Sequence, residues 1–480
     1  MGNYIGWIQN YLVSDSWVLL GAIGDPSWRL THLLPFQQYP VTINSTRYYA
    51  PVLISVYWLS LKLGGFSPER LHLIQIALHL STSVILFWVV LQLTESRLKA
   101  TAAGAIFAVH FASTECVGWW GSISHSSAGV LGVSALALYL RHLRGGSRLW
   151  WLASLVALLA ASLTQVTALP WFAILAGLDL YCCWRTGAWG KARRRLLVLG
   201  GLLALLLFVQ LQSVRFSGGG SYSYQLGPWV VRNLFFYPVS TVVPMLEGPS
   251  YSLMRDLVLA PVQRDAFTRL MTMNDAFGML LASGLTIVAV VLLWTRGALL
   301  RFCMLAFFVA TTPFLLVNGH GYRYLYVPLM FFSAGVAILL VDLYRRLLPS
   351  SRLAALAVLS ILPLFVALSC LESQRQLFWW QQAGYVAHKS LLQLREMQPS
   401  FPRGAKVLFG GLPDTLHNTN AQVWRNGMAE AVRVVYDDPT LKVEAYTKEE
   451  VERLFREELK GAPNTYGFVW DDWQFKRIAP

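Results

Sequence analysis

The chain alternates between long apolar stretches and short polar connections from residue 69 to residue 371. Each stretch approaches the ~20 apolar residues that a helix needs to cross the hydrocarbon core of a membrane. This alternation predicts a polytopic bundle of about ten transmembrane helices. The predicted spans are Glu69–Glu95, Ala100–Cys116, His125–Arg141, Leu149–Thr164, Leu169–Trp184, Leu196–Val214, Ala276–Thr295, Leu299–Val317, Tyr324–Tyr344 and Leu353–Leu371.

The two ends of the chain follow other patterns. Residues 1–68 contain no full-length apolar stretch, although the aromatic run Tyr49–Leu63 is typical of a short helix in the membrane interface. After the last span, residues 373–398 predict an amphipathic connecting helix. The tail beyond it predicts a charged helix and two strands, at Lys448–Lys460, Lys406–Gly410 and Thr465–Trp470. We expect this tail to be a separate soluble unit whose loss leaves the membrane part folded.

Composition agrees with a membrane protein, because 55% of the residues are hydrophobic and only 13% are charged, which excludes a soluble fold. The expected fold is an all-α polytopic membrane bundle with a small C-terminal soluble α/β domain. Three regions are predicted: an extracytoplasmic segment at 1–68, the bundle at 69–371 with a long outer loop at 215–275, and an extracytoplasmic connector with the α/β domain at 372–480.

Basic residues set the expected orientation. Arg and Lys cluster in every second connection, as in Arg185–Arg195, whereas alternate connections such as Thr164–Pro170 hold none. Basic loops stay in the cytoplasm, so both termini are predicted to be extracytoplasmic in a multi-pass protein of the cell inner membrane or an equivalent membrane. These loops explain the net charge of +14 without a nucleic-acid partner. The five cysteines show no spacing typical of a metal site or a disulfide framework.

Candidate chemistry lies first in the polar stretch Ser14–Pro51, on the predicted outer side. Asp15 could act as a general base, and Arg47 could hold a phosphate; together they are the minimum set for moving a sugar from a lipid phosphate to an acceptor. The plainer alternative is that Asp15 caps a short helix and Arg47 reaches a lipid headgroup.

Several stretches, in the same order, resemble the GT-C glycosyltransferases, nearest the protein O-mannosyltransferase-like and tetratricopeptide-linked members. They cover roughly residues 15–344 and are Arg47-Tyr48-Tyr49-Ala50-Pro51, Gly64-Gly65-Phe66-Ser67-Pro68, Leu73-Ile74-Gln75-Ile76-Ala77-Leu78-His79, Ala108-Val109-His110-Phe111 with Thr114-Glu115-Cys116-Val117-Gly118-Trp119, Thr164-Gln165-Val166-Thr167-Ala168-Leu169-Pro170, and Arg323-Tyr324-Leu325-Tyr326-Val327-Pro328.

The chain also departs from the family pattern. Asp15 stands alone where the family usually has two adjacent acids, and Phe111 replaces the proline that follows the histidine. Gln165-Val166 replaces a Lys-Glu pair, so no charge remains in that loop. The family also has a helix before its first outer loop, where this chain has only fourteen residues before Asp15.

The resemblance implies a GT-C-like enzyme that passes a sugar from a polyprenyl-phosphate donor to a protein or glycolipid acceptor outside the cytoplasm, with inversion. It implies Asp15 as general base and Glu115 as a second acid that positions acceptor or metal, with any divalent metal requirement left open. The implied substrate-binding residues are Arg47, Arg323, His125, His320 and Tyr324.

Plainer roles remain for several of these residues. Glu115 could be a helix-end carboxylate that faces water, and Arg323 could anchor its helix at the headgroups. His79 and His110 lie inside predicted spans, where a neutral imidazole bonded to a neighbouring helix is the ordinary outcome.

Two other functional classes stay open. A lipid-linked-sugar flippase would show charged groups and interrupted helices along a path through the membrane. A catalytically inactive polyprenyl-phosphate-binding member of the same fold is suggested by the single acid of the first loop and the missing Lys-Glu pair. An outward-facing cavity between Asp15 and Arg323 would favour the enzyme.

Overall fold

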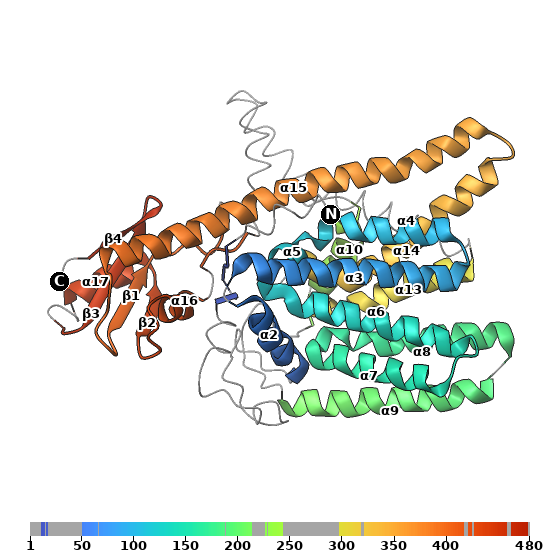
Figure 1. Ribbon diagram of the computed structural model, residues 1–480, viewed down its shortest axis with the longest axis horizontal. Helices are drawn as coiled ribbons and strands as arrows, with labels where there is room; N and C mark the ends of the chain where they lie inside the picture. The colour runs from blue at the N-terminus through green and yellow to red at the C-terminus, as the bar shows by residue number, and fades with distance from the viewer. Residues whose placement is uncertain are drawn as a thin grey trace.

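A computed structural model of the chain shows a bundle of long helices joined to a small α/β domain (Figure 1). The structure describes residues 11–14, 16–17, 50–65, 67–187, 189–213, 226–227, 229–242, 297–317, 321–416, 421–424, 427–457 and 462–478. The bundle contains α2 (Pro51–Gly64), α3 (Pro68–Thr94), α4 (Arg97–Val109), η3 (Phe111–Ser113), α5 (Thr114–Gly118), η4 (Trp120–Ser122), α6 (Ile123–Leu143), α7 (Arg148–Thr164), η5 (Val166–Ala168), α8 (Pro170–Thr186), α9 (Trp189–Ser213), α10 (Trp229–Ser240), α13 (Ala298–Leu315), η6 (Tyr322–Leu325), α14 (Tyr326–Leu347) and α15 (Arg352–Met397).

Helix starts follow local capping signals. The hydroxyl of Ser67 accepts from a backbone N–H in the first turn of α3, which begins with Pro68, and Ser96 does the same for α4. Ser351 caps α15 in the same way. These side chains satisfy N–H groups that have no partner inside the helix, so these three helices begin at defined residues.

The described part of the chain has seven helices long and apolar enough to cross a membrane, or eight if the bent pair of α4 with η3 and α5 forms one span. Every predicted span coincides with a described helix except Ala276–Thr295, which lies outside the described residues. The count is lower than the predicted ten because the span Ala276–Thr295 is not described and because α7, with 17 residues, is shorter than the spanning helices. The chain is therefore a multi-pass membrane protein, as predicted.

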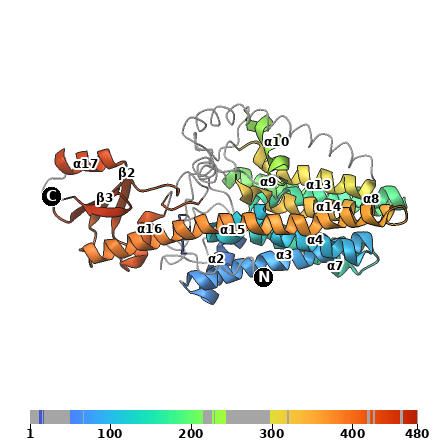
Figure 2. The same cartoon turned by 90° about the horizontal axis from the view of Figure 1, so that it is seen from above.

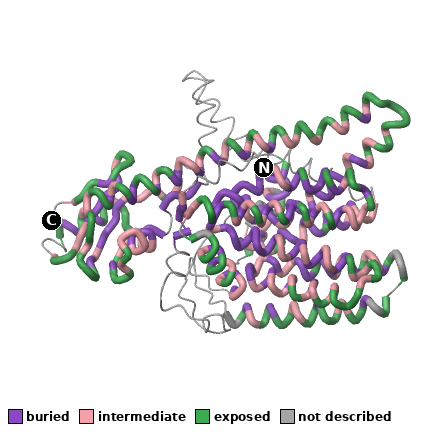
Figure 3. The backbone as a smooth tube through the Cα atoms, viewed as in Figure 1, coloured by how far each residue is buried: buried purple, intermediate pink, exposed green. Residues whose placement is uncertain are grey.

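The spanning helices differ in how deeply they are buried (Figure 3). The most apolar windows of α6 and α14 are 72% buried inside the protein, whereas those of α9 and α15 are 17% and 11% buried. Large apolar side chains such as Leu197, Leu205 and Leu211 are exposed on α9. Exposed leucine is unfavourable in water but suits contact with lipid tails. The α6 and α14 helices thus form the centre of the bundle, and α9 and α15 lie at its periphery.

The α15 helix is the longest element, with 46 residues. The sequence predicted a span that ends at Leu371 and a separate connector, but the structure has one continuous helix through both. Such a helix is roughly 69 Å long at 1.5 Å per residue, about twice the hydrocarbon thickness. It runs along the bundle and continues into the C-terminal domain (Figure 2).

The C-terminal domain is a four-stranded sheet with two helices. Its sheet has the order β2-β1-β3-β4, in which β1 is parallel to β2 and β3, and β4 is antiparallel to β3. The two predicted strands match β1 and β3, and the predicted charged helix matches α17, so the α/β prediction is confirmed. The elements are β1 (Lys406–Gly410), α16 (Met428–Val435), β2 (Lys442–Tyr446), α17 (Lys448–Glu457), β3 (Thr465–Asp471) and β4 (Gln474–Arg477).

One hydrophobic cluster joins this domain to the adjoining end of the bundle, here called the domain-side end. The cluster contains Trp120 of η4, Trp380 of α15, Phe409 of β1 and Trp424, all buried. The bundle and the domain are therefore in direct apolar contact.

Candidate functional site

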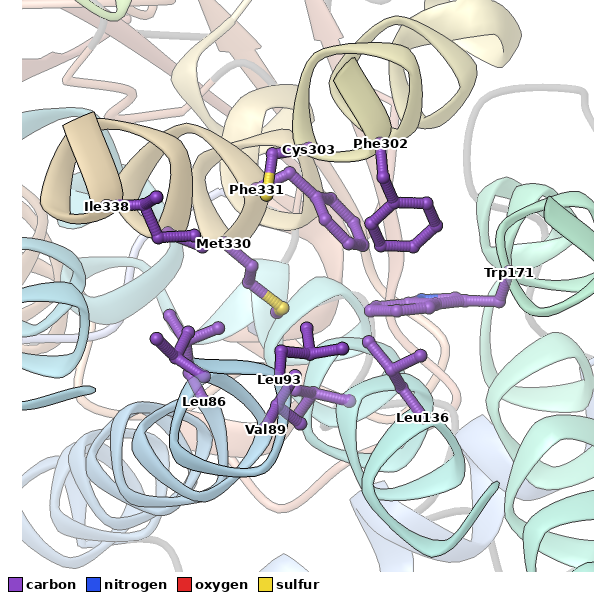
Figure 4. A pocket seen from close by; sticks show the side chains of 13 residues that line it. Leu86, Val89, Leu93, Leu136, Trp171, Phe302, Cys303, Met330, Phe331 and Ile338 are labelled. Atoms are coloured by element: carbon purple, nitrogen blue, oxygen red, sulfur yellow. The ribbon is translucent and has the colours of Figure 1, made fainter. Parts of the chain in front are cut away.

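The described helices enclose an apolar cavity at the centre of the bundle (Figure 4). None of its lining side chains carries a hydroxyl, an amide or a charge. The polar groups of the lining are the Trp171 indole N–H and the Cys303 thiol, which are too few to pair the hydroxyl groups of a sugar. This cavity therefore gives no support to a sugar path through the described helices. The lining residues are Leu86, Val89, Val90, Leu93, Val133, Leu136, Trp171, Phe302, Cys303, Met330, Phe331, Ala334 and Ile338.

Polar side chains gather instead at the domain-side end, where the second span breaks. The chain bends by 55° between α4 and the segment formed by η3 and α5. At the break, His110 Nδ1 accepts from the Ala112 backbone N–H at 3.1 Å, so its Nε2 carries the proton and donates to the Thr241 carbonyl at 3.0 Å. Both ring nitrogens of His110 are thus used to hold the bend.

The second intramembrane histidine has an equally structural setting. His79 is fully buried; its Nε2 lies 3.2 Å from the Ala108 carbonyl, and its Nδ1 lies 3.1 Å from the Tyr326 hydroxyl. These bonds join α3, α4 and α14. They favour the interpretation of His79 as a neutral imidazole that ties helices together.

Glu115 and Arg323 form a buried ion pair at the bend. Arg323 Nη1 donates to Glu115 Oε1, and the Arg323 backbone N–H donates to Glu115 Oε2 at 2.9 Å. The side chains are only 5% and 12% exposed. A Cβ on Gly321 would lie 3.1 Å from both Arg323 Nη1 and Glu115 Oε2, a tight approach that would press on the ion pair. Arg323 therefore accounts for both carboxylate oxygens of Glu115.

Two aromatic rings hold the other faces of the Arg323 guanidinium. Its central carbon lies 4.6 Å from the Tyr324 ring centroid and 5.4 Å from the Trp119 ring centroid. Its Nη2 also donates to the Tyr324 hydroxyl at 3.1 Å. A guanidinium fixed by a carboxylate and aromatic rings keeps a defined direction for its N–H groups, which suits the binding of an oxyanion such as phosphate.

Neighbouring side chains stabilise the irregular backbone around Glu115. Gln75 Nε2 of α3 donates to the Cys116 carbonyl and, at 2.9 Å, to the Trp119 carbonyl. Ser126 Oγ donates to the Cys116 carbonyl at 3.0 Å, and Ser122 Oγ lies 2.8 Å from the Glu115 carbonyl. The Glu115 and Trp119 carbonyls also accept backbone bonds, from the Trp119 and Ser122 N–H groups at 3.3 and 3.0 Å. The side-chain donors add to these bonds and help to stabilise the bend.

A neutral polar group lies beside the ion pair. Gln165 Nε2 lies 3.4 Å from both Ser124 Oγ and His125 Nε2, and the His125 ring meets the Tyr324 ring edge-on at 5.9 Å. Gln165 Oε1 and Ser127 Oγ are buried without a hydrogen-bond partner. In the sequence, Gln165 stood out only because it replaces one residue of a charged pair. Its position beside His125 makes it a candidate contact for hydroxyl groups of a substrate.

The α15 helix covers this site from the side of the C-terminal domain. Thr114 donates to Gln376 Oε1, and the Trp119 ring stacks on the Trp380 ring with centroids 6.1 Å apart. Glu372, one turn before Gln376, pairs with Arg375 at 2.6 Å. Nothing in the sequence singled out Gln376.

The acidic pair of the tail has a structural role. Lys476 and Lys448 both bond to Asp471, and these bonds lower the pKa of Asp471 to about 2. Asp472 has a left-handed backbone (φ 47°) between β3 and β4. The pair therefore lies where β3 ends and the turn to β4 begins.

The predicted site residues therefore divide in two. Glu115, Arg323, His125 and Tyr324 come together at the domain-side end. Three others, Asp15, Arg47 and His320, lie outside the described residues, so their roles stay predictions. In the part of the chain that the structure describes, no three His, Cys, Asp or Glu side chains are grouped so that they could hold a metal.

Comparison with known proteins identifies the architecture. The alignment with the structure of ArnT from Cupriavidus metallidurans in the apo state covers 98% of this chain and 91% of the ArnT chain. Its TM-score is 0.51, and the sequence identity is 14%. The archaeal oligosaccharyltransferase AglB from Archaeoglobus fulgidus, in complex with an inhibitory peptide and a dolichol-phosphate, aligns with 96% of this chain and 66% of its own at 11% identity, with a TM-score of 0.45. The ArnT alignment shows that the chain has the fold of the GT-C glycosyltransferases, as its sequence resemblance implied.

One curated relative shares sequence with part of the chain. The protein O-mannosyl-transferase Tmtc1 of Drosophila melanogaster is 32% identical over 122 residues, which is 25% of this chain and 14% of that protein. No family model matches the chain. The shared segment agrees with the predicted resemblance to O-mannosyltransferase-like proteins and spans a small part of that relative.

Proposed function

We propose that this protein is an integral membrane glycosyltransferase that moves a sugar from a polyprenyl-phosphate donor to a protein or glycolipid acceptor on the extracytoplasmic face, with inversion. The observation that carries the proposal is the buried Glu115–Arg323 pair at the bend of the second span, because it fixes a guanidinium at the domain-side end of the bundle. The GT-C fold and the Tmtc1 match support the same reaction class.

In the proposed reaction the acceptor hydroxyl attacks the anomeric carbon from the side opposite the phosphate. Asp15 takes the hydroxyl proton as the new C–O bond forms. The bond between the anomeric carbon and the phosphate oxygen breaks, and its electron pair leaves with the lipid phosphate, whose added charge Arg323 stabilises. Attack from the opposite side inverts the anomeric centre.

The remaining residues bind or position substrate. Glu115 orients Arg323 through both of its oxygens, so we assign it as a positioning residue rather than a free second acid. Tyr324 and His125 border the site beside Arg323 and are proposed to contact the donor sugar. Arg47 is proposed to contact the donor phosphate from the first outer segment. His320 is proposed to contact the substrate from the predicted outer connection between the spans Leu299–Val317 and Tyr324–Tyr344.

The experiment compares Asp15→Asn with Arg323→Ala in membranes of the expressing cell, which supply the acceptor. Mannosyl-phosphoryl-undecaprenol serves as donor because of the mannosyltransferase relative, and release of undecaprenyl phosphate is measured. Asp15→Asn should lower turnover by roughly 10²–10⁴ with donor affinity unchanged, because it removes only the proton acceptor. Arg323→Ala should mainly weaken binding of undecaprenyl phosphate.

Arg453→Ala, a change in an exposed ion pair of α17, is the control and should alter neither quantity. Wild-type turnover in Asp15→Asn would refute the catalytic assignment. Tight binding of undecaprenyl phosphate with no turnover from any tested donor in the wild type would favour an inactive binding protein.

A further inference from the structure

The first described residues of the chain lie against the C-terminal domain. Residues 11–14, 16 and 17 are here called the N-terminal segment. The Ser14 backbone N–H donates to the Val423 carbonyl at 3.0 Å, and the Ser14 hydroxyl donates to Gln422 Oε1 at 2.9 Å. Ser14 and Trp17 are buried. The Ser14–Gln422 bond joins positions 408 residues apart in the chain.

Close backbone packing reinforces the hydrogen bonds. Gly427, the residue before α16, has a left-handed backbone (φ 87°). A Cβ on Gly427 would overlap the Ser14 carbonyl oxygen and lie 3.0 Å from Trp17 Cβ. The N-terminal segment therefore fits against Gly427 only because this residue has no side chain.

The same segment contacts α15. The Tyr11 ring stacks on the His388 ring with centroids 4.3 Å apart, and a Cβ on Gly384 would lie 2.9 Å from the Tyr11 backbone nitrogen. Trp380, one turn before Gly384, stacks on Trp119 of the candidate site. One helical turn is about 5.4 Å long. Adjacent turns of α15 therefore contact the N-terminal segment, through Gly384, and the candidate site, through Trp380.

The C-terminal domain is in turn fixed to α15. Trp424 Nε1 donates to Ser390 Oγ at 3.1 Å, and the Trp424 backbone N–H donates to the Pro413 carbonyl at 3.0 Å. Trp424 follows Val423, which accepts from Ser14. Domain, helix and N-terminal segment therefore form one hydrogen-bonded unit.

We propose that the C-terminal domain is a positioning element of the site: it holds the N-terminal segment through Gln422, Val423 and Gly427 and so fixes the chain on both sides of position 15. The inference rests on the proposed function, in which position 15 supplies the base. Catalysis depends on such placement, because a 1 Å error in a reacting group can lower the rate by about 10²-fold. The domain is then part of the enzyme rather than a separable unit.

The test compares Gly427→Ala with Gly404→Ala in the full chain. Both glycines are in the C-terminal domain and have left-handed backbones, but a Cβ on Gly404 would have no atom within 4 Å. The two substitutions thus introduce the same kind of backbone strain, and only Gly427→Ala disturbs the N-terminal segment. Hydrogen exchange of the peptide that covers residues 11–17 reports its release.

Gly427→Ala should speed exchange in this peptide and lower turnover of mannosyl-phosphoryl-undecaprenol by about 10²-fold, with the Kd for undecaprenyl phosphate unchanged. Gly404→Ala should change neither the exchange rate of this peptide, nor the turnover, nor the Kd for undecaprenyl phosphate. Gln422→Ala, which removes the acceptor of the Ser14 hydroxyl, should act in the direction of Gly427→Ala. Gln422→Glu keeps an accepting oxygen and should restore both protection and turnover.

Two results would overturn the inference. If exchange is faster in Gly427→Ala but its turnover equals that of Gly404→Ala, release of the segment does not affect the site. Unchanged exchange in both Gly427→Ala and Gln422→Ala would show that the domain does not hold the segment. If Gly427→Ala fails to fold, the pair Gln422→Ala and Gln422→Glu decides. Failure of the proposed function is a different result, absence of turnover in the wild type.

Discussion

Replacing Glu115 by glutamine isolates the charge of the buried pair from its shape. The amide oxygen can still accept the Arg323 backbone N–H, but the guanidinium, 12% exposed, loses its counter-charge. Removing one partner of a buried pair costs about 3–5 kcal/mol. The Trp119 and Tyr324 rings, each worth about 0.5–2 kcal/mol to a cation, offset part of this loss. We therefore expect Glu115→Gln to lose stability at the lower end, about 3 kcal/mol.

If Arg323 holds a phosphate, an anionic ligand should compensate for the missing carboxylate. Undecaprenyl phosphate should then bind Glu115→Gln at least as tightly as the wild type and raise its unfolding temperature more. A ligand at 100 times its Kd contributes about 2.7 kcal/mol, and tenfold tighter binding adds about 1.4 kcal/mol. Thermal unfolding in detergent, with and without undecaprenyl phosphate, measures both effects.

The matched control is Glu372→Gln, which removes the carboxylate of a different Glu–Arg pair on α15. This variant should lose stability without a larger response to the ligand. The double variant with Arg323→Gln should lose less stability than Glu115→Gln alone, since a neutral pair leaves no buried charge. Additive losses, together with an equal ligand response in Glu115→Gln and Glu372→Gln, would refute the role of Arg323 as a phosphate holder.

Three further predictions concern orientation and packing. A cysteine placed at Ala188 should resist labelling from outside intact cells, because its basic connection is predicted to be cytoplasmic; labelling there would reverse the orientation. Asp179→Asn should destabilise the protein by about 3–5 kcal/mol without changing the Kd for undecaprenyl phosphate, because Asp179 is fully buried and bonded to Arg195 at 2.5 and 3.0 Å. Gly132→Ala should lower the free energy of unfolding by about 1–3 kcal/mol, because its Cβ would overlap the Trp171 indole ring. Gly177→Ala is the control, since its Cβ would have no atom within 4 Å. Equal unfolding temperatures for the two variants would contradict this packing.

Local patterns were enough to predict most elements of the fold. The strand at Lys406–Gly410 has the predicted bounds, because a short run of apolar and β-branched residues between turn residues is a local signal. The predicted change from span to connecting helix at Leu371 does not coincide with an end of the helix, and the reason is also local. Polarity rises there, but helical hydrogen bonds link residues four apart and do not depend on whether lipid or water surrounds them. Hydropathy therefore located the end of the span and not the end of the helix.

Contacts between distant residues could not be predicted in this way. Glu115 and Arg323 were each singled out from motifs, yet nothing in the sequence indicated that two residues 208 positions apart pair with each other. The expectation of a separable tail rested only on the loss of apolar helical periodicity after the last span. It could not show that Ser14 bonds to Gln422 and Val423, because an apolar or polar pattern identifies a buried face but not the partner that covers it.

The position of the site follows from the cost of irregular backbone in a membrane. A break in a spanning helix exposes carbonyls that lipid cannot satisfy, so it persists only where protein groups bond to them. Here Gln75, Ser122 and Ser126 supply those bonds, and His110 holds the bend itself. A straight helix would need none of these side chains. What the bend achieves is the placement of Glu115 against Arg323, and this gain in position is the physical reason to expect the chemistry of the protein at the domain-side end rather than in the apolar centre of the bundle.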